Sequence, residues 1–138
     1  MVHALQEARR VLKPGGILIE LRPAPIHRRV WITSGGGDQL LGAMSEVLDD
    51  DRAANQAVAE VLRSGLFTRE WRIQFPCDRV MNNVEDFAKF LETFAALGKK
   101  LPSHDILIRR LESAYRSTRG RKRIVVRAPL VLNLLRKS

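Results

Sequence analysis

The feature that most constrains the fold is a helix-breaking turn close to the first residues, Leu12-Lys13-Pro14-Gly15-Gly16. Before it, apolar residues recur at helical spacing with charged residues between them, which predicts an amphipathic helix over residues 3–12. Proline disfavours helical geometry in the residue before it, and the glycine pair lets the chain reverse through positive φ angles. The apolar, β-branched run Ile17–Leu21 then predicts a strand buried on both faces of a parallel sheet.

The middle of the chain alternates between loop-like and regular patterns. Residues 22–38 are predicted to form a mobile loop, with a short extended piece at residues 30–32. A second helix is predicted to begin at Asp49-Asp50-Asp51, because carboxylates cap free backbone N–H groups and favour the positive end of the helix dipole. Apolar and polar side chains alternate from Phe67 to Phe75, which predicts a half-buried strand that Pro76 ends.

The last third of the chain contains two further helix patterns and one strand pattern. Amphipathic spacing predicts helices over residues 84–94 and 108–115, separated by the segment from Gly98 to Pro102. Residues 123–132 are rich in β-branched side chains and predict a strand, in which Pro129 favours a bulge or an edge position. The predicted order is α-β-α-β-α-α-β, and 138 residues is the size of a single domain.

The net charge of +9 is concentrated towards the end of the sequence. Residues 1–108 hold 14 basic and 14 acidic residues, whereas residues 109–138 hold ten basic residues against Glu112 alone. A local field of one sign attracts phosphates or acidic partners. The candidates for phosphate or nucleic-acid contacts are Arg116, Arg119, Arg121, Lys122 and Arg123. The alternative, a solvated helix end, is favoured because only Tyr115 lies nearby in sequence for base stacking.

Metal and thiol chemistry find little support in the sequence. His3, His27 and His104 are far apart and have no further ligand at a familiar metal spacing. The acidic run at residues 49–51 is explained by a helix start, so no metal is predicted. The single Cys77 excludes an internal disulfide and has no CxxC partner, which predicts an inert thiol.

The sequence shows neither the pattern of a secretory signal nor that of a membrane span. The first residues lack the basic start and apolar run of a secretory signal, and no stretch approaches the roughly 18 apolar residues of a membrane span. We therefore expect a soluble cytoplasmic protein with no membrane partner.

Residues 5–18, Leu-Gln-Glu-Ala-Arg-Arg-Val-Leu-Lys-Pro-Gly-Gly-Ile-Leu, are similar to the helix and fifth strand of class I S-adenosylmethionine-dependent methyltransferases of the type 11/12 kind. Residues 61–67 are similar to the next helix running into the sixth strand, and the terminal strand ending in Arg136-Lys137 resembles the antiparallel seventh. The resemblance implies an α/β fold with a partial Rossmann-like methyltransferase sheet, whose last strand is antiparallel and lies between the other two. Residues 1–138 would form the C-terminal half of that domain, with a helical insertion at residues 84–118.

The resemblance also implies where a cofactor would bind. The family's glycine-rich first loop and the acidic residue after its second strand hold the cofactor, and both would precede Met1. The run Ser34-Gly35-Gly36-Gly37-Asp38 does not substitute for them, because it follows the fifth strand and no strong strand feeds it. We therefore expect no cofactor in this chain alone, and S-adenosylmethionine only if a partner chain supplies the missing half.

Ligands in open α/β sheets bind beyond the carboxyl ends of the strands, which makes Arg22, His27 and Trp31 the candidate substrate-side residues. The alternative is a surface loop with a basic cluster. An incomplete sheet exposes a strand edge and an apolar face, so we expect a homodimer or a partner chain that completes the sheet. Three functions remain open: a methyltransferase-like domain not catalytic alone, a structural or oligomerisation module derived from a methyltransferase, and a nucleic-acid-binding module that uses the basic C-terminal segment.

Overall fold

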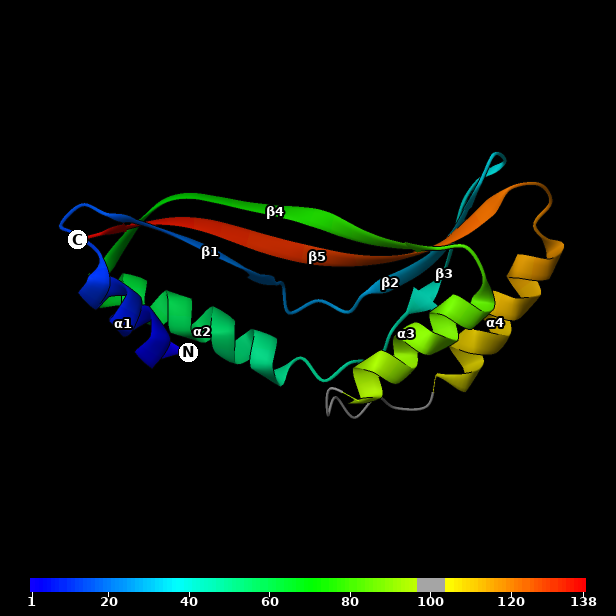
Figure 1. Cartoon of the computed structure of the whole chain (residues 1–138), viewed down its shortest axis with the longest axis horizontal. Coiled ribbons are helices and arrows are strands. Elements are labelled where there is room, and N and C mark those ends of the chain that lie inside the picture. Colours follow the sequence, from blue (N-terminus) through cyan, green and yellow to red (C-terminus); the bar gives the residue numbers. More distant parts are fainter. Residues whose placement is uncertain (97–103) are drawn as a thin grey trace. The chain divides into compact units, whose positions relative to one another are not determined.

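The structure is a computed structural model that describes residues 1–96 and 104–138 (Figure 1). The described residues form a mixed α/β fold of four helices and five strands. In chain order these elements are α1 (Val2–Val11), β1 (Ile17–Pro23), β2 (Arg29–Ser34), β3 (Gly37–Ala43), α2 (Asp49–Arg63), β4 (Phe67–Met81), α3 (Val84–Ala96), α4 (Asp105–Ser117) and β5 (Lys122–Lys137).

The chain divides into two compact units, which we describe separately. Unit 1 consists of Met1–Ile26, Leu48–Pro76 and Pro129–Ser138, and unit 2 consists of His27–Val47 and Cys77–Ala128. Each unit has its own cluster of buried apolar side chains. The long strands β4 and β5 contribute residues to both units.

In unit 1, strand β5 lies between β1 and β4. β5 is antiparallel to β1, in a register that runs from Ile17 opposite Arg136 to Pro23 opposite Leu130. The prediction that the last strand is antiparallel and lies between the other two is confirmed. The prediction of a parallel sheet around β1 is wrong, because the strand that pairs with β1 returns in the opposite direction.

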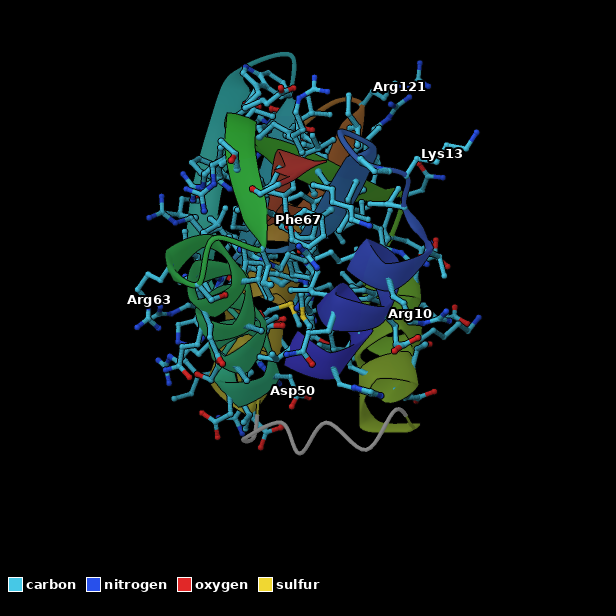
Figure 2. The ribbon with its side chains drawn as sticks, turned by 90° about the vertical axis from the view of Figure 1, so that its left-hand side faces the viewer. Arg10, Lys13, Asp50, Arg63, Phe67 and Arg121 are labelled. Atoms are coloured by element: carbon cyan, nitrogen blue, oxygen red, sulfur yellow. The ribbon has the colours of Figure 1, made fainter. Side chains whose placement is uncertain are left out.

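Helices α1 and α2 pack against one another and against one face of the unit 1 strands (Figure 1). Their buried side chains meet Phe67 of β4, which Figure 2 labels, and Leu135 of β5. The other face of β1 carries Ile17, Ile19 and Leu21, which are 45%, 65% and 56% exposed. The predicted burial of this strand on both faces is therefore wrong, because both helices of unit 1 pack on the same side.

The turn between α1 and β1 is fastened by the end of β5. Gly15 adopts a φ of 71°, as the glycine pair predicts, and the Gly16 amide donates to the Lys13 carbonyl over 2.9 Å. The Arg136 guanidinium donates to the Gly15 carbonyl at 2.7 Å, and the Lys137 ammonium donates to the Leu12 carbonyl at 2.6 Å. The last residues of the strand thus satisfy carbonyls at the helix end and in the turn that follows it.

Unit 2 contains a β-hairpin where a mobile loop was predicted. β2 and β3 pair antiparallel around a tight turn at Ser34–Gly37, and β2 also pairs antiparallel with β5. Val30 and Ile32 are fully buried while their neighbours in β2 are not, which is the period-two pattern of a strand with one buried face. The glycine run closes the hairpin, because Gly37 supplies a φ of 118°.

Helices α3 and α4 cover one face of the unit 2 strands (Figure 1). Both predicted helices are confirmed, and the core beneath them joins Phe87 and Leu111 to Val30, Ile32 and Ile124. The predicted separation of the two helices by the segment from Gly98 to Pro102 lies outside the described residues. The helix predicted at the acidic run is also confirmed, although no side chain caps the start of α2 by a hydrogen bond.

The prolines inside the two long strands, Pro76 in β4 and Pro129 in β5, behave differently from expectation. β4 does not end at Pro76 but continues to Met81, and most of its side chains are exposed rather than half-buried. An edge strand tolerates this proline, because β4 pairs only with β5 among the described strands. Pro129 lies inside β5 at the point where its partner changes from β2 to β1, so the missing N–H interrupts neither ladder.

Candidate functional site

Unit 1 contains a cluster of buried polar side chains near the carboxyl end of β1. Glu20, Arg22 and Asn133 are 8%, 7% and 0% exposed, and all three project to the helix-covered side. The Asn133 amide donates to Glu20 Oε2 over 2.6 Å, and Arg22 Nη2 donates to Asn55 Oδ1 of α2 over 2.7 Å. Arg22 Nε lies 2.9 Å from Glu20 Oε1, so the two charges form a buried ion pair.

Several polar atoms of this cluster have no hydrogen-bond partner among the described residues. They are Glu20 Oε1, Arg22 Nε, Arg22 Nη1 and Asn133 Oδ1. The ion pair between the first two atoms compensates their charge without forming a hydrogen bond. Arg22 Nη1 and Asn133 Oδ1 thus leave a donor and an acceptor in the same buried cluster, which suits a water molecule or a small polar group.

The three substrate-side candidates are divided between the units. Arg22 belongs to unit 1, whereas His27 and Trp31 belong to unit 2. His27 Nδ1 accepts a hydrogen bond from the Glu46 amide over 3.3 Å and helps to hold the chain beside the hairpin. Trp31 lies in the middle of β2 with the Arg127 guanidinium 5.9 Å from its ring centroid. Neither unit by itself contains all three of these candidate residues.

The basic candidates all belong to unit 2 but differ in their exposure and in whether their side chains are already hydrogen-bonded. Arg119, Arg121 and Arg123 are exposed, and Figure 2 shows Arg121 projecting away from the ribbon. Lys122 is half-buried, because its ammonium donates to the Thr118 carbonyl over 2.8 Å and also to the Tyr115 carbonyl. The same ammonium lies 4.4 Å from the Tyr115 ring centroid. Lys122 therefore stabilises the carboxyl end of α4 and is not free for a ligand.

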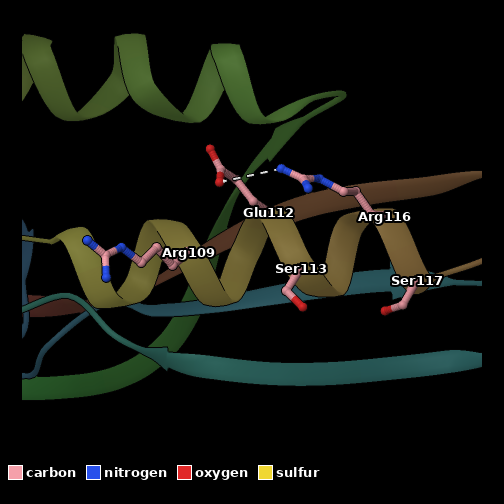
Figure 3. Close-up of a pocket in the computed structure, with 5 residues that line it drawn as sticks. All are labelled: Arg109, Glu112, Ser113, Arg116 and Ser117. Carbon is pink, nitrogen blue, oxygen red and sulfur yellow. Dashed lines mark ion pairs between the residues drawn. The ribbon is translucent and has the colours of Figure 1, made fainter.

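Arg116 lines an open depression of about 400 Å³ on the exposed side of α4 (Figure 3). Its other lining residues are Arg109, Glu112, Ser113 and Ser117. Arg116 Nη2 lies 3.8 Å from Glu112 Oε2, a pair that Figure 3 marks with a dashed line. Both side chains are well exposed, so this pair contributes little to stability and leaves the guanidinium accessible.

Metal-binding groups are not found in the described ranges. No three His, Cys, Asp or Glu side chains of residues 1–96 and 104–138 come together in a way that could hold a metal ion. Cys77 is exposed and unpaired. None of the helices in this part of the chain is long and apolar enough to cross a membrane.

Comparison with family models, curated proteins and solved structures found no match to this chain.

Sequence reasoning missed most of the buried cluster in unit 1. Arg22 was singled out, but Glu20, Asn55 and Asn133 were not. Two charges two residues apart in an otherwise apolar strand fall on the same face of the strand, which is a signal for a buried ion pair. Asn133 could be recognised only once the register placed it opposite Glu20.

Proposed function

We propose that this chain is a methyltransferase-like assembly module that is not catalytic alone. Unit 1 would form the C-terminal part of an S-adenosylmethionine-dependent methyltransferase sheet and associate with further strands along β1. The position of β5 between β1 and β4 supports this proposal, together with the packing of α1 and α2 on one face. That arrangement has the element order that the resemblance of residues 5–18 and 61–67 implies.

The observation that carries the proposal is the contrast between the two edge strands of unit 1. Within unit 1, β1 pairs only with β5, and its outward side chains Ile17, Ile19 and Leu21 are apolar and exposed. β4 is the other edge, where exposed charges at Arg69, Glu70 and Arg72 stand among Trp71 and Ile73, which are 51% and 39% exposed. Charges on an edge strand oppose pairing with another chain. β4 is therefore the better protected edge, and β1 is the edge open to a partner strand.

In the absence of another partner, the most accessible strand for β1 is β1 of a second copy. Antiparallel pairing centred on Ile19 places Ile17 opposite Leu21 of the other copy, so apolar side chains meet apolar side chains on the same face. One strand edge and three side chains bury a smaller surface than a standard interface, which buries about 800 Å² per partner. The expected homodimer is therefore weak and depends on protein concentration.

The proposal is tested by light scattering on the wild-type protein and an Ile19→Lys variant. The wild-type mass should rise with concentration from 15.7 kDa towards twice that value, whereas Ile19→Lys should stay at 15.7 kDa. Ile106→Lys is the matched control, because Ile106 of α4 is 70% exposed but lies in unit 2. A wild-type protein that stays monomeric, or an Ile19→Lys variant that associates equally well, would contradict the proposal.

Calorimetric titration with S-adenosylmethionine separates this module from a self-sufficient enzyme. The proposal places the cofactor site in strands that join β1, so the chain alone should give no binding heat at millimolar cofactor. Saturable binding by the chain alone would show that it contains a cofactor site of its own.

A further inference from the structure

The face of the unit 2 strands that points away from α3 and α4 has an unusual composition. Val30 and Ile32 of β2 and Ile124 and Val126 of β5 project into the core beneath the two helices. Side chains alternate along a strand, so the residues between them project to the opposite side. We call that side the outer face of unit 2. It consists of Arg29, Trp31, Thr33, Asp38, Leu40, Arg123, Val125 and Arg127.

Trp31 lies at the centre of the outer face. In the strand register it is opposite Val125 on one side and Leu40 on the other. Leu40 is 46% exposed, and both helices of unit 2 contribute to the core on the other side. Trp31 itself is half-buried and Val125 is only 5% exposed, so the ring lies in a small apolar strip that is accessible in part, on a sheet face that neither helix of unit 2 covers.

Arginines flank this strip at both ends. Arg29 is directly opposite Arg127, and Arg123 is opposite Thr33. Like charges directly opposite one another in a sheet are destabilising, and Arg127 is relieved by a bidentate pair with Asp78 at 2.7 Å. Arg29 is exposed and has no ion-pair partner in the described part of the chain.

The charge around the outer face is predominantly positive. Arg123 in β5 and Arg119 and Arg121 in the preceding turn are exposed and likewise have no carboxylate partner among the residues described. Asp78 is held by Arg127, and Asp38 in β3 is the other carboxylate on this side of the sheet. Four exposed arginines without an ion-pair partner among the described residues thus surround this partly exposed strip, which complements a polyanion.

We infer that the outer face of unit 2 binds single-stranded nucleic acid. Trp31 provides the ring on which an unpaired base stacks, while Arg29, Arg119, Arg121 and Arg123 contact phosphates. A duplex keeps its bases inside and offers nothing to the ring, so an open sheet with one aromatic residue favours a single strand. This inference is independent of the proposed assembly along β1, which concerns unit 1.

The test is fluorescence anisotropy with a labelled 15-nucleotide oligothymidylate, the same strand as a duplex, and polyglutamate as competitor. The wild type should bind the single strand at least about fivefold more tightly than the duplex, with affinity that falls steeply as salt rises. The Arg29→Gln/Arg123→Gln double variant should lose at least about tenfold in affinity and show a shallower salt dependence.

The control is Arg109→Gln/Arg110→Gln, which removes two exposed arginines from α4 on the other side of the same strands. It removes the same number of charges as the first double variant. It should nevertheless keep most of the affinity, because α4 lies on the side of the strands opposite the outer face. Equal loss in both variants, tighter binding of the duplex, equal competition by polyglutamate, or no binding would each overturn the inference.

Stacking is tested without altering Trp31. The protein has two tryptophans, so a Trp71→Phe variant leaves Trp31 as the only one. Single-stranded oligothymidylate should quench the fluorescence of this variant, with the same concentration dependence as the anisotropy. Binding that is detected by anisotropy while the Trp31 emission stays unchanged would show that the ring does not stack. This result would overturn the assignment to the outer face.

Discussion

At the scale of single residues, the buried charges of unit 1 carry a desolvation cost that their ion pair and hydrogen bonds offset in part. Glu20 and Arg22 neutralise one another beneath α2, while Asn133 and Asn55 satisfy part of their hydrogen-bonding capacity. A buried ion pair is weak evidence for stability, but breaking it leaves one charge unpaired in the interior. The pair therefore specifies how β1, β5 and α2 fit together.

Arg22→Met should destabilise the protein by about 3–5 kcal/mol, because the variant leaves the Glu20 carboxylate buried without its partner. Urea denaturation measures this change in the free energy of unfolding. Arg10→Met is the control, since the Arg10–Glu7 pair is exposed and should contribute less than about 1 kcal/mol. The Glu20→Gln/Arg22→Met double variant should recover part of the loss, because it removes both charges and keeps an acceptor for Asn133. Equal stabilities of the two single variants would refute this role.

His104 at the start of α4 should make stability depend on pH. Burial lowers the pKa of His104 below its ordinary value of 6.5, and its Nε2 has no partner among the described residues. The unfolded chain then binds a proton at a higher pH than the folded chain, so the free energy of unfolding falls as pH drops below about 6.5. Urea denaturation between pH 5 and 8 should show a smaller fall for His104→Gln. Identical pH profiles for both proteins would contradict this assignment.

At the scale of elements, the helices were predictable because each shows its buried side in its own sequence. Periodic apolar residues marked α1, α2, α3 and α4 without reference to any neighbour. The hairpin was missed because the glycine run at residues 35–37 dominated a strand pattern of only six residues. The exposure of β1 could not be predicted, because an apolar run does not reveal whether both of its faces are covered.

The candidate site could likewise be predicted only in part from the sequence. Arg22 was recognised from its place at the end of a strand, but its partners depend on the register of β1 with β5 and on the packing of α2. The outer face of unit 2 was not recognised for a similar reason. Arg29, Trp31 and Arg123 are brought to one side only by the pairing of β2 with β5.

The turn between α1 and β1 gives an element-scale prediction. Gly15→Ala should destabilise the protein by about 1–2 kcal/mol, because a side chain is disfavoured at the observed φ of 71°. Thermal or urea denaturation measures the loss. Gly35→Ala is the matched control, since Gly35 does not have a positive φ and an added Cβ would meet nothing within 4 Å. Equal stability of the Gly15→Ala variant and the wild type would show that the turn does not require glycine there.

At the scale of the whole molecule, the two units present surfaces of different chemistry. Unit 1 has an apolar strand edge at β1, and unit 2 has a basic outer face around Trp31. We expect the first to associate with protein and the second with nucleic acid. Because the Ile19→Lys and Arg29→Gln/Arg123→Gln variants lie in different units, the two functions can be removed separately.

The central claim, that β1 is the open assembly edge, is tested most directly by amide hydrogen exchange resolved by residue. The spectra would be recorded at two protein concentrations that span the monomer-to-dimer transition. Amides of Ile17–Arg22 that do not bond to β5 should exchange more slowly at the higher concentration, whereas those of Phe67–Phe75 on the β4 edge should not change. Unchanged exchange along β1, or protection that appears along β4 instead, would contradict the account.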